Sequence, residues 1–248
     1  MLKRVFDVTA SAFGLIVASP VLLPVMFLVW WQDKHSPFYV APRVGLNDKS
    51  FKMIKMRSMV INADKSGVDS TSANDNRITA VGQFIRRYKL DELTQLWNVL
   101  KGDMSLVGPR PNVKRETELY TPVERKLLAV KPGITDISSI VFSDEGDILK
   151  DQVDPDIAYN QLIRPGKSTL GLIYIENQSL LLDIKLCFLT VIAVVSREKA
   201  LAGVQKILKD IDAPNDVILL SQRTQALVPR APPGGDRIVT SRDGNPYA

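Results

Sequence analysis

Adjacent carboxylates at Asp91 and Glu92 are the side chains of this sequence with the clearest capacity for chemistry. An apolar pattern at positions i, i+3, i+4 and i+7 follows them, formed by Leu93, Leu96, Trp97 and Leu100. The pattern predicts a short amphipathic helix that ends at Gly102. The first turn of a helix attracts anions. A helix cap would explain a single Asp there, whereas an adjacent pair can also bind a divalent cation and the phosphates that it bridges.

A conformationally restricted arginine follows this predicted helix. Arg110 lies between Pro109 and Pro111, and each proline fixes its own backbone φ angle. Such a turn holds a guanidinium in one direction, which suits recognition of a planar or anionic group. A surface turn with an incidental arginine is the alternative, and the residues alone leave both open.

Two more basic residues lie at the end of a predicted strand. The run Phe51–Met56 mixes apolar with basic residues, and alternation places Lys55 on the face of its apolar neighbours, with Arg57 directly after the run. Lysines that protect the edge of a sheet are the simpler explanation. The alternative is a cationic strand end, formed by Lys55 and Arg57, that faces phosphate groups.

The scarce residue types narrow the chemistry further. The 248 residues include 32 Lys and Arg against 27 Asp and Glu, one Cys and one His. The excess of five positive charges fits an anionic partner such as phosphate, nucleotide or lipid headgroup, but it is too small to indicate nucleic acid. Cys187 allows no intrachain disulfide, and His35 alone argues against zinc centres and His-based triads. A carboxylate, Lys, Ser or Tyr would then serve as acid, base or nucleophile.

An uncharged segment over residues 10–31 is about as long as a helix that spans a hydrocarbon core. The length of this run argues against a cleaved secretory signal. Pro20 and Pro24 remove two amide donors near its middle and favour a bend, and Ser19 can supply a hydrogen bond there. A re-entrant hairpin would keep the flanking basic residues on the cytoplasmic face. From the residues alone, the hairpin and a kinked spanning helix both remain open.

The remaining elements must position these candidates. Extended segments are expected at 38–40 and 51–56, and helices are expected to begin at Thr79 and Asp154. Residues 179–195 form an apolar run that two charges interrupt, which favours an amphipathic helix against the membrane surface or the soluble domain over a second spanning helix. Proline and glycine beyond residue 213 are typical of a linker or a disordered tail.

A continuous run from Lys89 to Pro111 carries a specific resemblance. Further matching segments are Arg43-Val44-Gly45, Phe51–Met59, Arg77-Ile78-Thr79 with Val81-Gly82, and Lys131–Thr135. On these segments the sequence resembles the bacterial sugar transferases, the monotopic phosphoglycosyl transferases. The resemblance covers about residues 3–199.

The resemblance implies transfer of a phosphosugar from a UDP-sugar to undecaprenyl phosphate, with release of UMP, as the first membrane step of glycoconjugate biosynthesis. Asp91 would be the nucleophile that forms a covalent phosphosugar intermediate. Glu92 would be its partner, and the pair would bind Mg²⁺ or Glu92 would deprotonate the acceptor. Arg110 in its Pro-Arg-Pro turn would contact the uridine, and Lys55 and Arg57 would contact the phosphates.

The same resemblance implies a fold and a location. Ser19-Pro20 matches the helix break of the family, which favours the re-entrant hairpin. We expect a helix-rich α/β protein of the bacterial inner membrane. Residues 1–35 would form the helix-break-helix hairpin, and 36–212 a compact cytoplasmic catalytic domain with amphipathic interfacial helices. Residues 213–248 would form a Pro/Gly-rich tail that contacts a second protomer in a homodimer.

The donor sugar and the competing functions are less defined. Family habit predicts an N-acetylated amino or deoxyamino sugar. Asp136–Ile140, followed by Asp144 and Glu145, departs from the commonest family pattern, and the change bears either on the sugar accepted or on loop packing alone. A non-catalytic membrane scaffold of a glycan assembly pathway and a nucleotide-sugar hydrolase are the alternative functions. An intact Asp91–Glu92 pair argues against the scaffold.

Overall fold

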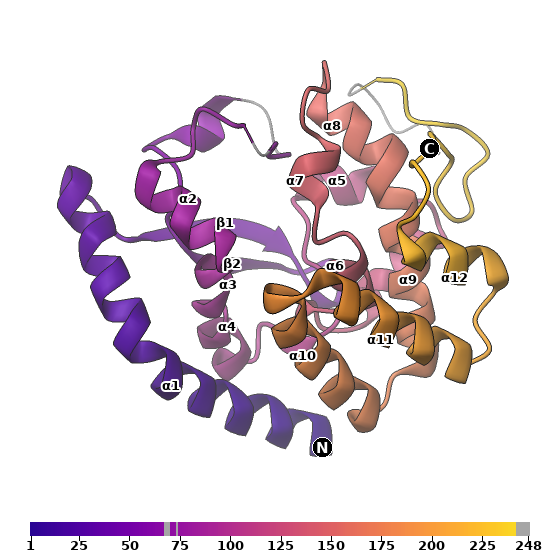
Figure 1. Cartoon of the computed structure of the whole chain (residues 1–248), viewed down its shortest axis with the longest axis horizontal. Coiled ribbons are helices and arrows are strands. Elements are labelled where there is room, and N and C mark those ends of the chain that lie inside the picture. The colour runs from indigo at the N-terminus through magenta and orange to yellow at the C-terminus, as the bar shows by residue number, and fades with distance from the viewer. Residues whose placement is uncertain (67–69, 73, 242–248) are drawn as a thin grey trace.

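The N-terminal segment is one long bent helix. The computed structural model describes residues 1–66, 70–72 and 74–241, and helix α1 runs over Leu2–Asp33 with Pro20 and Pro24 inside it. Ser19 Oγ donates to Ile16 O at 2.8 Å. Ile16 O is the carbonyl that an amide at position 20 would have bonded in a regular helix. In place of the expected helix-break-helix, α1 is a continuous helix with a bend, visible in Figure 1, and its re-entrant position in the membrane stays a prediction.

Helix α1 packs on the rest of the chain with one face and leaves the other exposed. Its inner face contributes Leu22, Val25 and Val29 to a small core that includes Met56, Ile85 and Leu90. Its outer face exposes Phe13, Ile16, Val17, Leu23, Phe27 and Trp31. By length and composition, α1 is long and apolar enough to cross a membrane. An exposed apolar surface of this size indicates contact with lipid or protein.

A two-stranded antiparallel hairpin follows α1. Strand β1 (Phe38–Val44) pairs with β2 (Ser50–Met56), and Tyr39 lies opposite Lys55. This confirms both predicted extended segments, with β1 longer than expected. The hairpin places the Lys55 side of β2 against the helices that come next in the chain.

Three short helices carry the most informative part of the sequence. Helix α2 (Ala80–Arg87) begins as predicted, with Thr79 Oγ1 accepting a hydrogen bond from Gly82 N at 2.9 Å. The single helix expected over residues 91–101 is instead two, α3 (Leu90–Leu93) and α4 (Leu96–Lys101). Gly102 ends α4 with a φ of 91°, as predicted.

The rest of the chain surrounds a second, very small parallel sheet. Strand β3 (Ser105–Val107) pairs with β4 (Gly133–Thr135). The helical elements of this part of the chain are α5 (Lys114–Glu118), the 3₁₀ segment Glu124–Ala129, α6 (Ile137–Val141), α7 (Glu145–Ile148), α8 (Pro155–Ala158), the π-helical turn Tyr159–Ile163, α9 (Arg164–Asn177), α10 (Leu180–Val195), α11 (Arg197–Asp210) and α12 (Asn215–Gln222). Their apolar faces meet in the main core, which includes Met104, Ile137, Phe142, Leu170 and Leu208. The helix-rich α/β class is thus confirmed.

The C-terminal tail is ordered against its own chain. It begins with α12, which the proline and glycine content did not predict, and continues as an irregular segment with turns to residue 241. Thr121 Oγ1 donates to Pro233 O at 2.6 Å, and Gln161 Nε2 donates to Val239 O at 2.7 Å. Residues 242–248 of the predicted tail lie outside the described residues. The contact with a second protomer stays a prediction.

Candidate active site

Four charged side chains meet at the start of α3. Lys55 Nζ lies 3.3 Å from Asp91 Oδ2 and 4.0 Å from Glu92 Oε1. Arg110 Nη2 donates to Glu92 Oε1 at 2.7 Å. Asp91 is buried, with 7% of its surface exposed. The structure therefore brings together Asp91, Glu92, Lys55 and Arg110, which are four of the predicted site residues.

Two polar residues fix β2 against the helices that carry the carboxylates. Asn98 is fully buried; its Oδ1 accepts from Ile54 N at 2.9 Å and its Nδ2 donates to Lys52 O at 2.7 Å. Thr94 Oγ1 donates to Asp91 O at 3.0 Å and to Ile54 O at 3.3 Å. These contacts set the position of Lys55 relative to Asp91. Neither residue was among the predicted site residues, although their i, i+4 spacing beside an apolar face was a usable signal.

A close approach of two backbones holds the Pro-Arg-Pro turn. Gly108 N donates to Thr135 O at 3.0 Å, and Gly133 N donates to Pro109 O at 3.0 Å. A Cβ atom on Gly133 would lie 2.1 Å from Gly108 N, so only glycine fits there. Arg110 leaves this rigid crossing and reaches Glu92 on α3.

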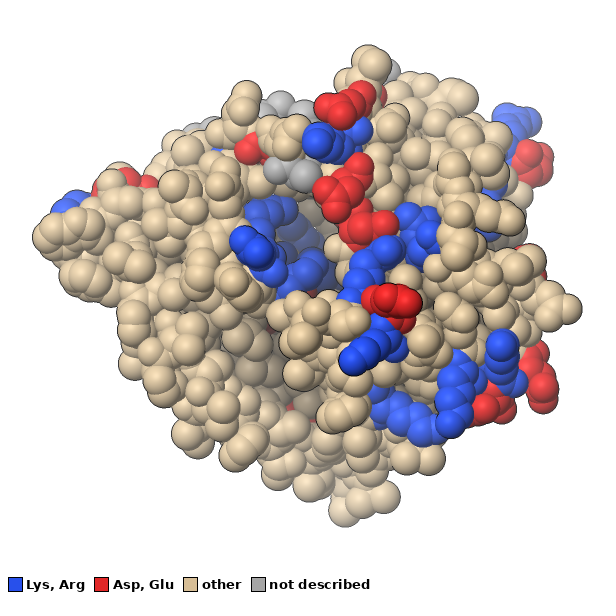
Figure 2. Space-filling model, viewed as in Figure 1, with Lys and Arg blue, Asp and Glu red and all other residues tan. Residues whose placement is uncertain are grey.

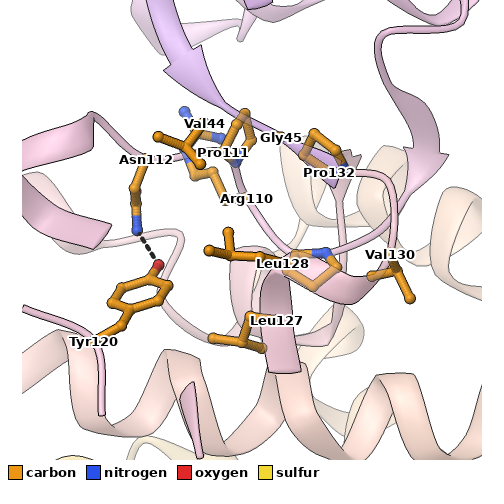
Figure 3. Close-up of a pocket in the computed structure, with 11 residues that line it drawn as sticks. Val44, Gly45, Arg110, Pro111, Asn112, Tyr120, Leu127, Leu128, Val130 and Pro132 are labelled. Atoms are coloured by element: carbon orange, nitrogen blue, oxygen red, sulfur yellow. Dashed lines mark hydrogen bonds between the residues drawn. The ribbon is translucent and has the colours of Figure 1, made fainter. Parts of the chain in front are cut away.

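Pro109 and Pro111 lie beside a small pocket, and Figure 3 labels Pro111 among the residues around it. With Arg110 they line a small pocket whose other walls are Val44, Gly45, Asn112, Tyr120, Leu127, Leu128, Val130 and Pro132. Asn112 Nδ2 donates to Tyr120 Oη at 2.8 Å within it. These mostly apolar residues surround the Pro-Arg-Pro turn on the side of this pocket.

Opposite charges dominate the electrostatics of the site. Burial raises the pKa of Glu92, but the positive charges of Arg110, Lys55 and Lys89 outweigh that effect and hold this pKa well below its usual range. The charge of Glu92 raises the pKa of Arg110 despite burial. Burial lowers the pKa of Lys55, and the two carboxylates offset only part of that change. At neutral pH, Glu92 is therefore an ionised carboxylate that Arg110 holds in place.

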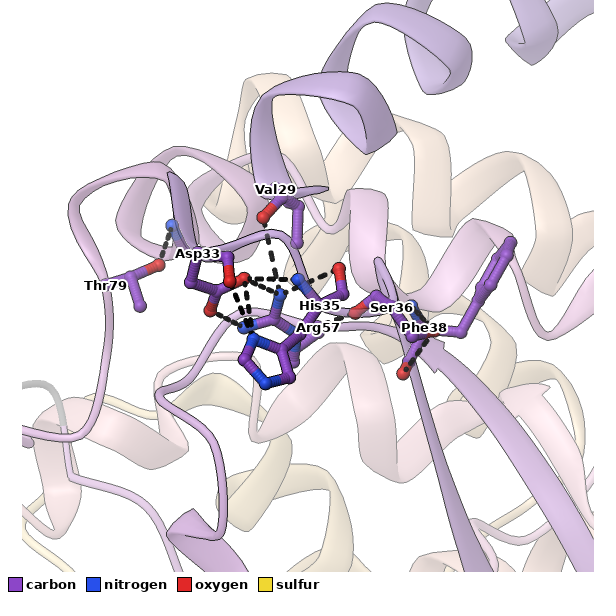
Figure 4. Close-up of polar contacts among 8 residues, drawn as sticks. Val29, Asp33, His35, Ser36, Phe38, Arg57 and Thr79 are labelled. Atoms are coloured by element: carbon purple, nitrogen blue, oxygen red, sulfur yellow. Dashed lines mark hydrogen bonds and ion pairs between the residues drawn. The ribbon is translucent and has the colours of Figure 1, made fainter. Parts of the chain in front are cut away.

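Arg57 lies in a different place from the one predicted. Strand β2 ends at Met56, and the Arg57 guanidinium turns to the end of α1, where it donates to Asp33 Oδ2 at 2.6 Å and to Asp33 Oδ1 at 2.8 Å. It also donates to Ser36 O at 2.8 Å and Val29 O at 3.3 Å (Figure 4). Only 6% of Arg57 is exposed. The assignment of Arg57 to phosphate binding is therefore corrected: it fastens α1 to β2.

Removing this fastening should reduce stability and leave donor binding unchanged. We expect Arg57→Met to lower the thermal unfolding midpoint by about 4–8 °C, because Asp33 loses a two-pronged partner. The KM for the donor should stay within about twofold of wild type, the usual range for changes outside a site. Arg87→Met, on an exposed residue of α2, is the matched control. An unchanged unfolding midpoint with a large rise in KM would instead support a role of Arg57 in phosphate binding.

One face of the molecule has a hollow near its centre. Figure 2 shows Lys and Arg side chains inside a depression near the centre of this face, with acidic and basic side chains along one edge. Lys89 and Arg86 act electrostatically on Glu92 and Lys55, respectively, so both add positive charge around the carboxylates. Arg86 lies on α2 and was not among the predicted site residues. A cluster of cations around two carboxylates is suited to a phosphorylated ligand.

Comparison with known proteins decides the family. The family model described as bacterial sugar transferase matches residues 1–197, from α1 to the start of α11. This chain belongs to the bacterial sugar transferase family. The match contains every residue of the charged cluster.

Named relatives of this sugar transferase have related activities. Over 77% of its length, the chain is 35% identical to the exopolysaccharide production protein ExoY of Sinorhizobium fredii and covers 84% of that protein. It is 37% identical over 80% of its length to the undecaprenyl-phosphate galactose phosphotransferase of Salmonella typhimurium. It is 36% identical over 76% of its length to the undecaprenyl-phosphate glucose phosphotransferase of Komagataeibacter xylinus. The matched part spans 41% and 35% of the last two proteins, respectively.

The donor atoms of the site suit a magnesium ion that shares its coordination with a substrate. The described part of the chain holds no group of three or more His, Cys, Asp and Glu side chains that could enclose a metal by itself. Magnesium binds through one or two carboxylates together with substrate phosphates and water. Asp91 and Glu92 are such a pair, and Lys55 and Arg110 balance their charge in this state.

Proposed function

We propose that this protein transfers a phosphosugar from a UDP-sugar to undecaprenyl phosphate and releases UMP. The observation that carries the proposal is the buried Asp91 carboxylate beside Lys55, next to a Glu92 that Arg110 orients. The names of relatives that act on undecaprenyl phosphate support the acceptor. For the donor we propose an N-acetylated amino sugar, and the galactose and glucose in the relatives' names make neutral hexoses the competitors.

The first half-reaction is an attack by Asp91. An Asp91 oxygen bonds to the phosphorus that carries the sugar, and the bond from that phosphorus to the bridging oxygen of the diphosphate breaks, so that UMP leaves with the electron pair. An ionised carboxylate needs no base for this step. Lys55, close to Asp91, balances the negative charge that the diphosphate brings into the site.

The second half-reaction releases the enzyme. A phosphate oxygen of undecaprenyl phosphate attacks the phosphorus on Asp91, and the acyl-phosphate bond breaks to return the free carboxylate. The product is undecaprenyl-diphosphate-sugar. Because UMP has left beforehand, the water-soluble donor and the lipid need not occupy the site together.

Magnesium is part of the proposal. Asp91 and Glu92 would hold the ion, which when bound would neutralise the diphosphate and assist departure of UMP. We expect EDTA to lower UMP release at least about 100-fold, and added Mg²⁺ to restore it. Measuring UMP in membranes before and after the addition checks this. Full activity in EDTA would mean that Lys55 and Arg110 suffice to balance the phosphates.

Contacts at both ends of α1 support a re-entrant arrangement in the membrane. Near its start, Lys3 Nζ contacts Asp183 Oδ2 at 2.5 Å, and Arg4 Nη2 donates to Leu100 O at 2.8 Å. At its end, Asp33 binds Arg57. A spanning helix would separate its ends by the thickness of the bilayer, so one domain could not bind both. We propose that the bend at Ser19-Pro20 dips into the cytoplasmic leaflet and that both ends remain on the cytoplasmic side of the inner membrane.

A second apolar surface supports the same orientation. Helix α10 exposes a stripe formed by Leu181, Ile184, Phe188, Val191 and Val195. At the end of α1, Lys34 Nζ lies 3.6 Å from the ring centroid of Trp31, a pairing typical of the membrane interface. We propose that α10 lies on the membrane surface beside α1.

Cysteine labelling distinguishes re-entrant from spanning. In a Cys187→Ser background, Leu2→Cys and His35→Cys place one thiol at each end of α1. We expect a membrane-impermeant maleimide to label both variants in inside-out vesicles and neither in right-side-out vesicles. Labelling of the two ends from opposite sides would contradict the hairpin.

Turnover with both substrates tests the whole function. The full chain in membranes or nanodiscs is incubated with UDP-N-acetylglucosamine, UDP-N-acetylgalactosamine, UDP-glucose and UDP-galactose, with and without undecaprenyl phosphate. The proposal predicts UMP together with a lipid-linked sugar diphosphate for at least one donor. Free sugar phosphate in place of the lipid product would indicate a hydrolase, and no UMP from any donor would favour the scaffold.

A further inference from the structure

An ion pair that the proposed reaction does not use involves α7, the helix that Figures 1 and 2, which share one view, place along an edge of the hollow. Glu145 is the first residue of α7, and Lys167 lies on α9; their side chains form a direct ion pair. Lys167 Nζ also lies 5.5 Å from the centroid of the Tyr159 ring. The side chain of Lys167 is 12% exposed and that of Glu145 32% exposed, so Glu145 still offers oxygen surface to a ligand.

This pair belongs to the same electrostatic site as the two catalytic candidates. Burial raises the pKa of Glu145, but the charges of Lys167, Arg110 and Lys89 outweigh it and lower this pKa. Arg110 is the residue that holds Glu92. Arg110 and Lys89, whose charges also act on Glu92, therefore lie near enough to Glu145 to lower its pKa. Glu145 has no direct bond to Asp91 or Glu92 among the described contacts.

Asp144, the residue before Glu145, holds the start of α7 in place. Asp144 Oδ2 forms ion pairs with Arg197 Nη2 at 2.9 Å and with Arg223 Nη2 at 3.2 Å. Arg197 begins α11, and Arg223 follows α12, so the C-terminal helices clamp the start of α7. A helix held in this way can distinguish ligands of different shape, because its polar atoms keep their positions whichever ligand binds.

The chemistry of the pair matches an uncharged polyol better than a phosphate or a metal. Glu145 repels phosphates, and Lys167 is already neutralised by Glu145. A largely buried ion pair adds little stability over an apolar pair of the same size. A carboxylate that accepts and an ammonium that donates can together bind neighbouring hydroxyl groups, each of which donates and accepts.

We propose that Glu145 and Lys167 bind the hydroxyl groups of the donor sugar and determine which sugar epimer is accepted. The proposal rests on the proposed function, since it assigns part of the same site. The substrate class is the uncharged, hydroxylated sugar of a UDP-sugar.

Donor selectivity tests the assignment. UMP release is measured with UDP-glucose against UDP-galactose, and with UDP-N-acetylglucosamine against UDP-N-acetylgalactosamine; within each pair the donors differ only in the configuration of one hydroxyl. We expect Glu145→Gln and Lys167→Met each to change the kcat/KM ratio of at least one pair about tenfold or more, because a site group loses its hydroxyl partner. Asp147→Asn, an exposed carboxylate of the same helix, should leave both ratios unchanged.

A purely structural role gives a different result. If Glu145→Gln and Lys167→Met reduce kcat/KM by the same factor for all four donors, or change nothing, the proposal is wrong. Thermal unfolding identifies a variant that does not fold, and the other variant then decides alone. Failure of the proposed function is distinct, because the wild-type protein would then release no UMP from any donor.

Discussion

Asp91→Asn is expected to abolish UMP release, with a loss of at least about 10⁴-fold, because the amide cannot act as the nucleophile. The substitution preserves shape, and Asp91 Oδ2 lies 3.3 Å from Lys55 Nζ, so the variant loses a charge without opening a cavity. The loss should be as large without undecaprenyl phosphate as with it. That equality is specific to a covalent first half-reaction, since a direct transfer would release no UMP in the absence of acceptor.

The control for this variant separates chemistry from folding. Asp147→Asn changes an exposed carboxylate on α7 and should retain wild-type activity. The unfolding midpoint of Asp91→Asn should remain close to wild type. Normal turnover by a folded Asp91→Asn protein would show that another group accepts the phosphosugar.

Lys55→Met is expected to have the second largest effect, a reduction in kcat of about 10²–10³-fold, as for loss of one preorganised charge-stabilising group. Lys55 reaches both carboxylates, and its charge must be maintained in a site that disfavours it, since burial lowers its pKa from the ordinary 10.5. The variant leaves Asp91 without this cation and leaves the incoming diphosphate with less positive charge around it. Steady-state UMP release measures the change.

The lowered pKa of Lys55 also predicts a pH dependence. A group whose pKa is lowered loses its proton at a lower pH, so activity that depends on the charged form should decline as the pH rises toward 10.5, before an ordinary lysine would titrate. Lys55→Arg keeps its charge in that range and should remove this alkaline decline, even if the longer side chain lowers the maximal rate. An identical alkaline profile in wild type and Lys55→Arg would assign the decline to another group.

Local signals in the sequence predicted several elements well. Thr79 caps α2, Gly102 ends α4 in the left-handed region, and Asp154 starts α8, because each depends on contacts within a few residues. Ser19 supplies a hydrogen bond at Pro20 for the same reason. The site residues Asp91, Glu92 and Arg110 were found because they lie in one continuous motif.

The errors arise where partners lie far apart in the chain. Side-chain alternation along β2 predicted that Lys55 lies in the site. The prediction for Arg57 was wrong because β2 ends one residue before it, and its partner Asp33 lies 24 positions away. The amphipathic pattern treated residues 91–101 as one helix, whereas the chain divides between α3 and α4 and leaves Trp97 54% exposed. The Glu145–Lys167 pair joins two helices 22 residues apart, and no local rule connects them.

Intact-protein mass spectrometry tests most directly whether a covalent phosphosugar intermediate forms on Asp91. The full chain is mixed with a UDP-sugar and no lipid acceptor, quenched, and analysed for mass and for released UMP. We expect the protein to gain the mass of one phosphosugar, located by peptide analysis at Asp91, with up to one equivalent of UMP. Addition of undecaprenyl phosphate should remove the adduct. UMP that forms only when the acceptor is present, with no adduct on the protein at any time, would contradict the account.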